Sequence, residues 1–148
     1  MQHSAEELIQ KLGLLPHAEG GWYSFVWRSA REIAQDALPA CYSGPRMSCS
    51  MIHYMLKAGE ESRWHRLCSA EVWAWHAGGS LEMTLGGSGD APAAEKKLLL
   101  GPGLERGERF QVGVPEHMWQ TSRVTAGAYV LVTCIVAPSY DDNEWYMP

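Results

Sequence analysis

Residues 59 to 79 read Gly-Glu-Glu-Ser-Arg-Trp-His-Arg-Leu-Cys-Ser-Ala-Glu-Val-Trp-Ala-Trp-His-Ala-Gly-Gly and hold the main clue to the architecture of this chain. Glycines bound the stretch, and Ser69 interrupts it at a place where a turn fits. We therefore predict two short strands, Arg63 to Leu67 and Glu71 to Ala77, joined by a turn.

The spacing within this stretch brings one histidine and one glutamate together. Five residues separate Gly59 from His65, and five more separate His65 from Glu71. Because successive side chains of a strand point to opposite faces, residues two positions apart lie on the same face. Two such sets are Arg63, His65 and Leu67 on the first strand, and Glu71, Trp73 and Trp75 on the second. If both sets line one barrel interior, His65 and Glu71 converge there.

The N-terminal residues predict one short helix within residues 1–14. Ser4 and Glu7 form a capping-box pair, and Gly13 lies where a helix would stop. An apolar stripe of Leu8, Ile9 and Leu12 lies between these two signals.

The rest of the chain consists of short strands separated by Gly, Pro and Ser. Residues 29 to 46 are predicted to form a long loop. The predicted strands are Trp22 to Arg28, Met47 to Lys57, Arg63 to Leu67, Glu71 to Ala77, Leu81 to Leu85, Lys96 to Leu100, Arg109 to Val114 and Ala128 to Val136. Short strands without intervening helices predict an all-β sandwich or barrel.

Composition and charge exclude several classes of partner. The formal net charge is −5 and the chain has no basic run, so nucleic acid is not an expected partner. The longest apolar run, Tyr129 to Ala137, is too short to span a bilayer. The four cysteines form neither a CxxC pair nor a zinc-finger spacing. We expect a cytoplasmic protein with reduced thiols and no membrane partner.

Several segments taken together resemble the fifth cupin subfamily, a domain of unknown function. They are Pro16 to Tyr23, Arg28-Ser29, Gly59 to Gly79, Pro115 to Gln120 and Val136 to Pro138. The resemblance covers nearly the whole chain. It implies a single cupin domain over residues 1–148, with a jelly-roll β barrel in residues 15–148. It also implies a homodimer and a similarity to the nucleotide-sugar epimerases of the cupin superfamily.

The residues at the metal-binding positions of cupins argue against a metal here. Cupins that bind metal carry a second histidine two residues after the first, and this chain has Leu67 there. The second cupin motif places a histidine five residues after its proline, and here Gln120 follows Pro115 at that distance. We therefore expect no cofactor. If a divalent transition metal is bound, its ligands are His65, Glu71 and Gln120.

A metal-free role for the same residues is proton exchange with a small polar ligand, such as a sugar or a nucleotide-sugar. An epimerase or isomerase step needs a base and an acid beside a carbonyl. We assign His65 as the base, Tyr54 as the acid and Glu71 as a further catalytic residue. The predicted ligand-binding residues are the walls Trp73 and Trp75, the amide of Gln120, and Arg28 and Arg63 as partners for a ligand anion.

Two other functions remain open on the sequence. One is a metal-dependent oxidoreductase of the dioxygenase type. The other is a non-catalytic binding or structural protein, in which His65 and Glu71 satisfy each other in the interior. The strand from Trp22 to Arg28 carries bulky side chains on both faces, which suits coverage by a second subunit.

Overall fold

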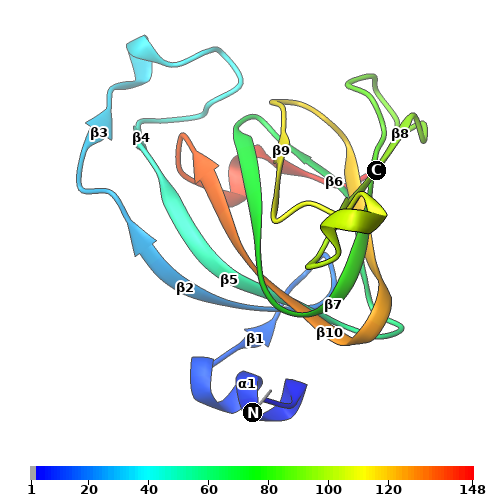
Figure 1. Ribbon diagram of the computed structural model, residues 1–148. Helices are drawn as coiled ribbons and strands as arrows, with labels where there is room; N and C mark the ends of the chain where they lie inside the picture. Colours follow the sequence, from blue (N-terminus) through cyan, green and yellow to red (C-terminus); the bar gives the residue numbers. More distant parts are fainter. Residues whose placement is uncertain (1–2) are drawn as a thin grey trace.

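The structure is a computed structural model that describes residues 3–148. Two long strands dominate it, and shorter strands pair on either side of them (Figure 1). The elements in chain order are α1 (Ala5–Leu12), β1 (Leu15–Pro16), β2 (Trp22–Arg28), β3 (Glu32–Ile33), the 3₁₀ turn η1 (Gln35–Ala37), β4 (Arg46–Met47), β5 (Ser50–Lys57), β6 (Glu61–Leu67), β7 (Ala70–Leu85), β8 (Lys96–Leu100), η2 (Leu104–Arg106), β9 (Gln111–Val114), β10 (Gln120–Ala137), η3 (Asp142–Glu144) and β11 (Trp145–Tyr146).

Helix α1 begins and ends as the sequence predicts. The Ser4 hydroxyl accepts from the Glu7 amide, and the Glu7 carboxylate accepts from the Ser4 amide. Gly13 closes the helix in the left-handed conformation. The buried face of α1, at Ala5 and Leu8, packs below the barrel in a cluster with apolar residues of β5 and β10 (Figure 1).

The strands form a jelly roll in which the named pairs are antiparallel, as expected for an all-β cupin. One path of neighbours runs β1-β2-β5-β10-β6-β11, and β7 pairs with β10, β8 and β9. Strand β10 therefore touches β5, β6 and β7 along its length. The main core fills the space between these strands and includes Tyr54, Trp73, Met83 and Val130, each 1% exposed or less.

Strands β7 and β10 are longer than predicted because each bends from one part of the sheet into the next. The sequence predicts separate strands 71–77 and 81–85, whereas β7 continues through Gly78 and Gly79. The bend brings the backbones so close that a Cβ on Gly79 would lie 1.7 Å from the Ala126 carbonyl oxygen. Glycine is therefore required where the strands bend, and here it does not end the strand.

Two short strands, β3 and β4, pair with each other outside the main sheet. Together with η1 they form an arm that extends to one side of the barrel (Figure 1). The sequence predicts a long loop with a helical turn there, and the two short strands are an addition. Within residues 3–148, no helix is long and apolar enough to cross a membrane.

Candidate functional site

A cavity of about 70 Å³ opens between β2, β5, β6 and β10, at the place where the C-terminal segment covers the barrel. Its walls combine aromatic rings with buried titratable groups, among them Glu19, Tyr54, His65, Glu71, Cys134 and Trp145. The residues Glu19, Glu71 and His65 are each at most 7% exposed. Such a concentration of buried titratable groups in one cavity marks a candidate site.

The loop before β2 carries Glu19 into this cavity because Gly20 lets the loop approach β6. Gly20 has φ 111°, and a Cβ there would lie 2.1 Å from the Glu61 carbonyl oxygen. The Tyr54 hydroxyl donates to the Gly20 carbonyl at 2.6 Å, and the Arg63 amide donates to the Glu19 carbonyl at 2.8 Å. These backbone contacts hold the Glu19 side chain toward the interior.

His65 and Glu19 face each other in the cavity through one ring nitrogen and one carboxyl oxygen. The Nδ1 atom of His65 lies 2.7 Å from the Arg63 carbonyl oxygen, which can only accept, so Nδ1 carries a hydrogen. The other ring nitrogen, Nε2, faces the Glu19 Oε2 atom at 3.4 Å. Two bare acceptors at that distance would repel each other, so one proton belongs to the pair. Burial raises the pKa of Glu19 and lowers the pKa of His65, which favours neutral imidazole beside protonated carboxyl.

Glu19 has further polar partners from three parts of the chain. Its Oε1 atom accepts from the Ser62 hydroxyl at 3.0 Å, and its Oε2 atom accepts from the Trp145 indole at 3.3 Å. The Nδ1 atom of His17 lies 3.7 Å from Oε2 and accepts from the Glu19 backbone amide at 3.1 Å. Burial lowers the pKa of His17, so this imidazole is also held neutral.

Glu71 faces the same cavity from β7 and is held by Gln120. The Gln120 amide nitrogen donates to the Glu71 Oε2 atom at 2.6 Å. Burial raises the pKa of Glu71, and the neighbouring thiol of Cys134 is fully buried, which raises its pKa as well. The second carboxyl group of the cavity is therefore also easily protonated.

Tyr54, the predicted acid, also lines the cavity. Its ring meets the Trp73 ring edge-on at 5.3 Å. Burial raises the pKa of Tyr54 well above its ordinary value, with the charge of Glu19 acting in the same direction. Tyr54 therefore keeps its hydrogen at neutral pH and can act only as a donor or acid.

The structure separates the other predicted ligand-binding residues. Trp73 is 1% exposed and lies in the core behind Tyr54. Trp75 is partly buried, stacks on Phe110 and donates its indole hydrogen to Gly79, and it does not line the cavity. Arg28 is exposed at the end of β2.

Arg63 does not share a face with His65, which corrects the prediction. Against β10, His65 pairs with Gln120 and Ser62 pairs with Ser122, so β6 has one residue more than its partner in this interval. This bulge resets the alternation, and it places Ser62 in the interior while Arg63 is exposed. The Arg63 guanidinium donates to the backbone carbonyls of Ala18 and Glu19.

The predicted metal ligands His65, Glu71 and Gln120 do not fit a metal centre well. The amide nitrogen of Gln120 is directed at Glu71, so Gln120 serves as a hydrogen-bond donor there. In residues 3–148, no group of three or more His, Cys, Asp or Glu side chains is arranged to hold a metal ion. The Leu67 side chain contributes only hydrocarbon to the cavity wall.

Sequence reasoning did not find four residues that line this cavity: His17, Glu19, Tyr23 and Trp145. The first three lie in the segment Pro16 to Tyr23, which was noted only for its family resemblance. A buried glutamate between a histidine and two glycines was the available signal. Trp145 lies in the C-terminal segment, whose docking site no local pattern specifies.

Comparison with known proteins places this arrangement in a family. The sequence profile described as "Cupin superfamily (DUF985)" matches residues 6–147. No curated protein matches the chain significantly. A hypothetical protein from Leishmania major is 31% identical with a TM-score of 0.85, over 99% of this chain and 88% of that one.

Two further solved structures are similar to this chain. A protein from Shewanella oneidensis is also 31% identical, with a TM-score of 0.83 over 99% of this chain and 85% of that one. A cupin-2 domain from Rhodospirillum rubrum, 13% identical, has a TM-score of 0.61 over 91% of this chain and 74% of that one, and shares the fold. The chain therefore belongs to the cupin superfamily, in the family described as DUF985.

Proposed function

We propose that this cupin binds a small, uncharged polar ligand in the cavity and moves a proton on it, as an isomerase or epimerase of a hydroxy-carbonyl compound such as a sugar. The observation that supports the proposal is the 3.4 Å contact between the Nε2 atom of His65 and the Oε2 atom of Glu19, two buried groups that can exchange one proton. A buried pair that exchanges one proton at little cost can take a proton from a ligand and return it.

The size of the cavity limits the ligand. A water molecule needs about 10–15 Å³ of such volume, so a cavity of about 70 Å³ accepts a few heavy atoms. The reacting end of a small sugar fits within that space. The remainder of a larger ligand would lie toward the opening or displace the C-terminal segment.

The charge of the lining selects against anions. In the part of the chain that the structure describes, the cavity is lined by two carboxyl groups and by neither Lys nor Arg. Its histidines are held neutral by burial. A phosphate group would lose its hydrating water on entering the cavity, and no Lys or Arg side chain there would compensate for that loss. The cavity therefore suits a sugar ring better than the diphosphate of a nucleotide-sugar.

The proposed step uses three of the lining groups. With the Glu19 hydrogen turned away from it, the Nε2 atom of His65 takes a proton from a carbon beside the ligand carbonyl. The electron pair of the broken C–H bond forms a carbon–carbon double bond, and the π pair of the carbonyl moves to its oxygen. Tyr54 turns its hydrogen from the Gly20 carbonyl toward that oxygen and stabilises the enolate. In an isomerase, His65 returns its proton to the former carbonyl carbon, while Tyr54 gives its proton to the enolate oxygen and takes the proton of the neighbouring hydroxyl, which becomes the new carbonyl. In an epimerase, a proton from water reaches the same carbon from the other face, and His65 releases its proton to water. Glu19 keeps the imidazole ready by giving or accepting the second proton.

Hydrogen exchange with solvent tests this function directly. Wild-type protein is incubated in D₂O with a panel of small aldoses, ketoses and hydroxyketones, and the loss of the proton beside the carbonyl is followed by ¹H NMR. We expect exchange with at least one compound, and at least a hundredfold slower exchange in His65→Ala and Glu19→Gln, the usual size of an acid–base contribution.

His76→Ala is the matched control, because His76 is an exposed histidine of β7 that does not line the cavity. Exchange that survives both site variants contradicts the proposed roles. A compound that binds in the cavity and never exchanges supports the binding-protein alternative.

A further inference from the structure

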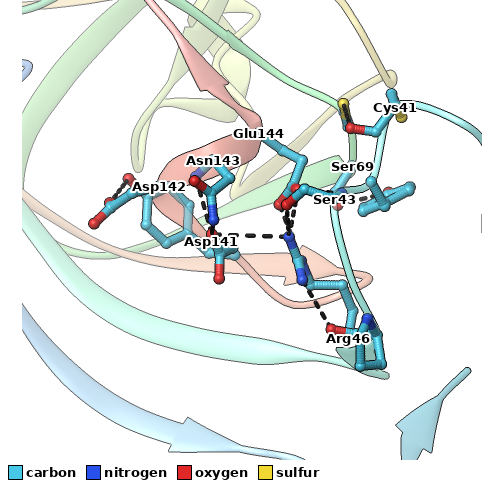
Figure 2. A network of polar contacts seen from close by, with 12 residues as sticks. Cys41, Ser43, Arg46, Ser69, Asp141, Asp142, Asn143 and Glu144 are labelled. Carbon is cyan, nitrogen blue, oxygen red and sulfur yellow. Dashed lines mark hydrogen bonds and ion pairs between the residues drawn. The ribbon is translucent and has the colours of Figure 1, made fainter. Parts of the chain in front are cut away.

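A second cluster of buried charge lies at the junction of the β4 region and the C-terminal segment. Arg46 and Glu144 form its centre, and Ser43 and Asp141 adjoin them (Figure 2). The side chain of Arg46 is 7% exposed and that of Glu144 is 5% exposed. Nothing in the proposed reaction uses this cluster, although burying two charges is costly.

The two side chains meet in a bidentate ion pair. The Nε atom of Arg46 donates to the Glu144 Oε2 atom at 2.9 Å, and its Nη2 atom donates to Oε1. The backbone amide and the hydroxyl of Ser43 each donate to Oε1 at 2.9 Å. Burial alone would raise the pKa of Glu144, but the bonds from Arg46 and Ser43 outweigh it and lower that pKa. The carboxylate is thus fixed by four donors.

The residue after Glu144 is the one that reaches the cavity. Trp145 begins β11 and pairs with Leu67 of β6, and the Cys68 amide donates to the Glu144 carbonyl at 3.3 Å. From this position the Trp145 indole donates to the Oε2 atom of Glu19, the same oxygen that faces His65. One short segment therefore links the ion pair to the shared proton.

We propose that Arg46 and Glu144 are positioning residues for the cavity: their ion pair fixes the C-terminal segment so that the Trp145 indole donates to Glu19, and this bond determines how the proton is divided between Glu19 and His65. The proposal deepens the proposed function, since it concerns the same proton. Arg46 and Glu144 act through Trp145 and touch no ligand.

The direction of the effect follows from the donor. An indole N–H directed at Oε2 favours the ionised carboxylate and so favours the proton on His65. Loss of that donor moves the proton toward Glu19. The other titratable groups that line the cavity are not altered by these substitutions: Glu71 from β7, His17 before β2, Tyr23 from β2, Tyr54 from β5, Cys134 from β10 and Tyr140 after β10.

The test is an NMR titration of ligand-free protein with ¹⁵N-labelled histidine, which reports the fraction of His65 in the imidazolium form. Trp145→Phe keeps an aromatic ring and removes the donor, whereas Glu144→Gln keeps the shape and removes the charge held by Arg46. We expect both variants to reduce the imidazolium-to-imidazole ratio of His65 at a given pH by about threefold to tenfold, the range for one ordinary hydrogen bond. Glu82→Gln is the matched control, because Glu82 pairs with Lys97 and Arg123 on the surface.

Each outcome decides the proposal. Equal shifts in Trp145→Phe and Glu144→Gln, with none in Glu82→Gln, support it. A shift in Trp145→Phe alone overturns it, because Trp145 would then be positioned without the ion pair; no shift in either variant also overturns it. If circular dichroism shows that Glu144→Gln does not fold, Arg46→Lys replaces it, with a smaller shift in the same direction. Because no ligand is used, failure to find turnover leaves this test unaffected.

Discussion

The amide nitrogen of Gln120 donates to the carboxylate of Glu71 across 2.6 Å, although the two residues lie 49 positions apart in the chain. Both side chains are buried. The Gln120 amide thus supplies the buried carboxylate with a hydrogen-bond donor in place of water. Gln120 therefore has a structural role in addition to any role in ligand binding.

Replacing Gln120 with leucine is expected to destabilise the protein by about 1–3 kcal/mol at pH 7, because Glu71 loses its donor. The loss should shrink in acid, where Glu71 is protonated and needs less support. Urea denaturation at several pH values measures both effects. Gln111→Leu, on an exposed position of β9, should change stability by less than about 0.5 kcal/mol. A pH-independent loss would contradict this account of Glu71.

Glu19→Gln should become more stable relative to the wild type as the pH rises from about 4.5 to 7. Burial raises the pKa of Glu19 in the folded chain, so the folded state holds a proton that the unfolded chain releases near 4.5. That contribution to stability is complete below the unfolded pKa and is lost as the pH rises through the folded pKa. Glutamine does not ionise, so Glu19→Gln does not lose stability in this way as the pH rises. Thermal melts across this range give the difference, and Glu61→Gln serves as an exposed control. A difference that does not vary with pH would show that Glu19 ionises as freely in the folded state as in the unfolded one.

Elemental analysis of protein purified without a metal-affinity tag should find transition metal well below one ion per chain. Gln120 is engaged as a donor, and Leu67 supplies no ligand atom. The double substitution Leu67→His and Gln120→His should raise the affinity for Zn²⁺ or Ni²⁺, because two imidazoles would join His65 and Glu71. A stoichiometric metal in the wild type that is lost in His65→Ala and Glu71→Ala would instead support the metal-dependent oxidoreductase.

We predict that the protein is a homodimer in which β2 lies at the interface. The side chains of Phe25 and Trp27 on this strand are 64% and 49% exposed, and large exposed apolar side chains on a strand favour pairing with another chain. Light scattering at micromolar concentration should give twice the mass of the chain. Substitution of both residues by lysine should give a monomer, whereas Leu104→Lys, at an equally exposed leucine, should not. A monomeric wild type would contradict the prediction.

The sequence predicted those features that depend on neighbouring residues. The helix signals at Ser4, Glu7 and Gly13 act within one or two turns, and each works as predicted. Strand periodicity placed His65 and Glu71 in the interior, where both are buried. Alternation misplaced Arg63, since it assumes an unbroken pleat and a bulge adds one residue to β6.

Contacts between distant residues were beyond sequence reasoning. Glu19 reaches the cavity because Gly20 lets its loop pass close to β6. The residues around Glu19 do not show that β6 is the strand that this loop contacts. Trp145 reaches the cavity because the preceding residue, Glu144, is fixed by an ion pair to Arg46. Arg46 and Glu144 lie 98 positions apart in the chain. Both contacts depend on the finished tertiary structure, so no spacing within one segment could predict them.

The hydrogen bond from Trp145 to Glu19 spans 126 positions, which makes it one of the longest loop closures in this protein. Contacts of such sequence separation form late in folding, because the entropy of closing the loop is lost before the contact stabilises it. The barrel can therefore exist with its core complete and its last strand undocked. Such an open form needs β11 to leave β6 and Glu144 to leave Arg46 and Ser43, at a smaller free-energy cost than unfolding the barrel. Ligand exchange by this local opening would let the cavity fill and empty while the rest of the molecule stays folded.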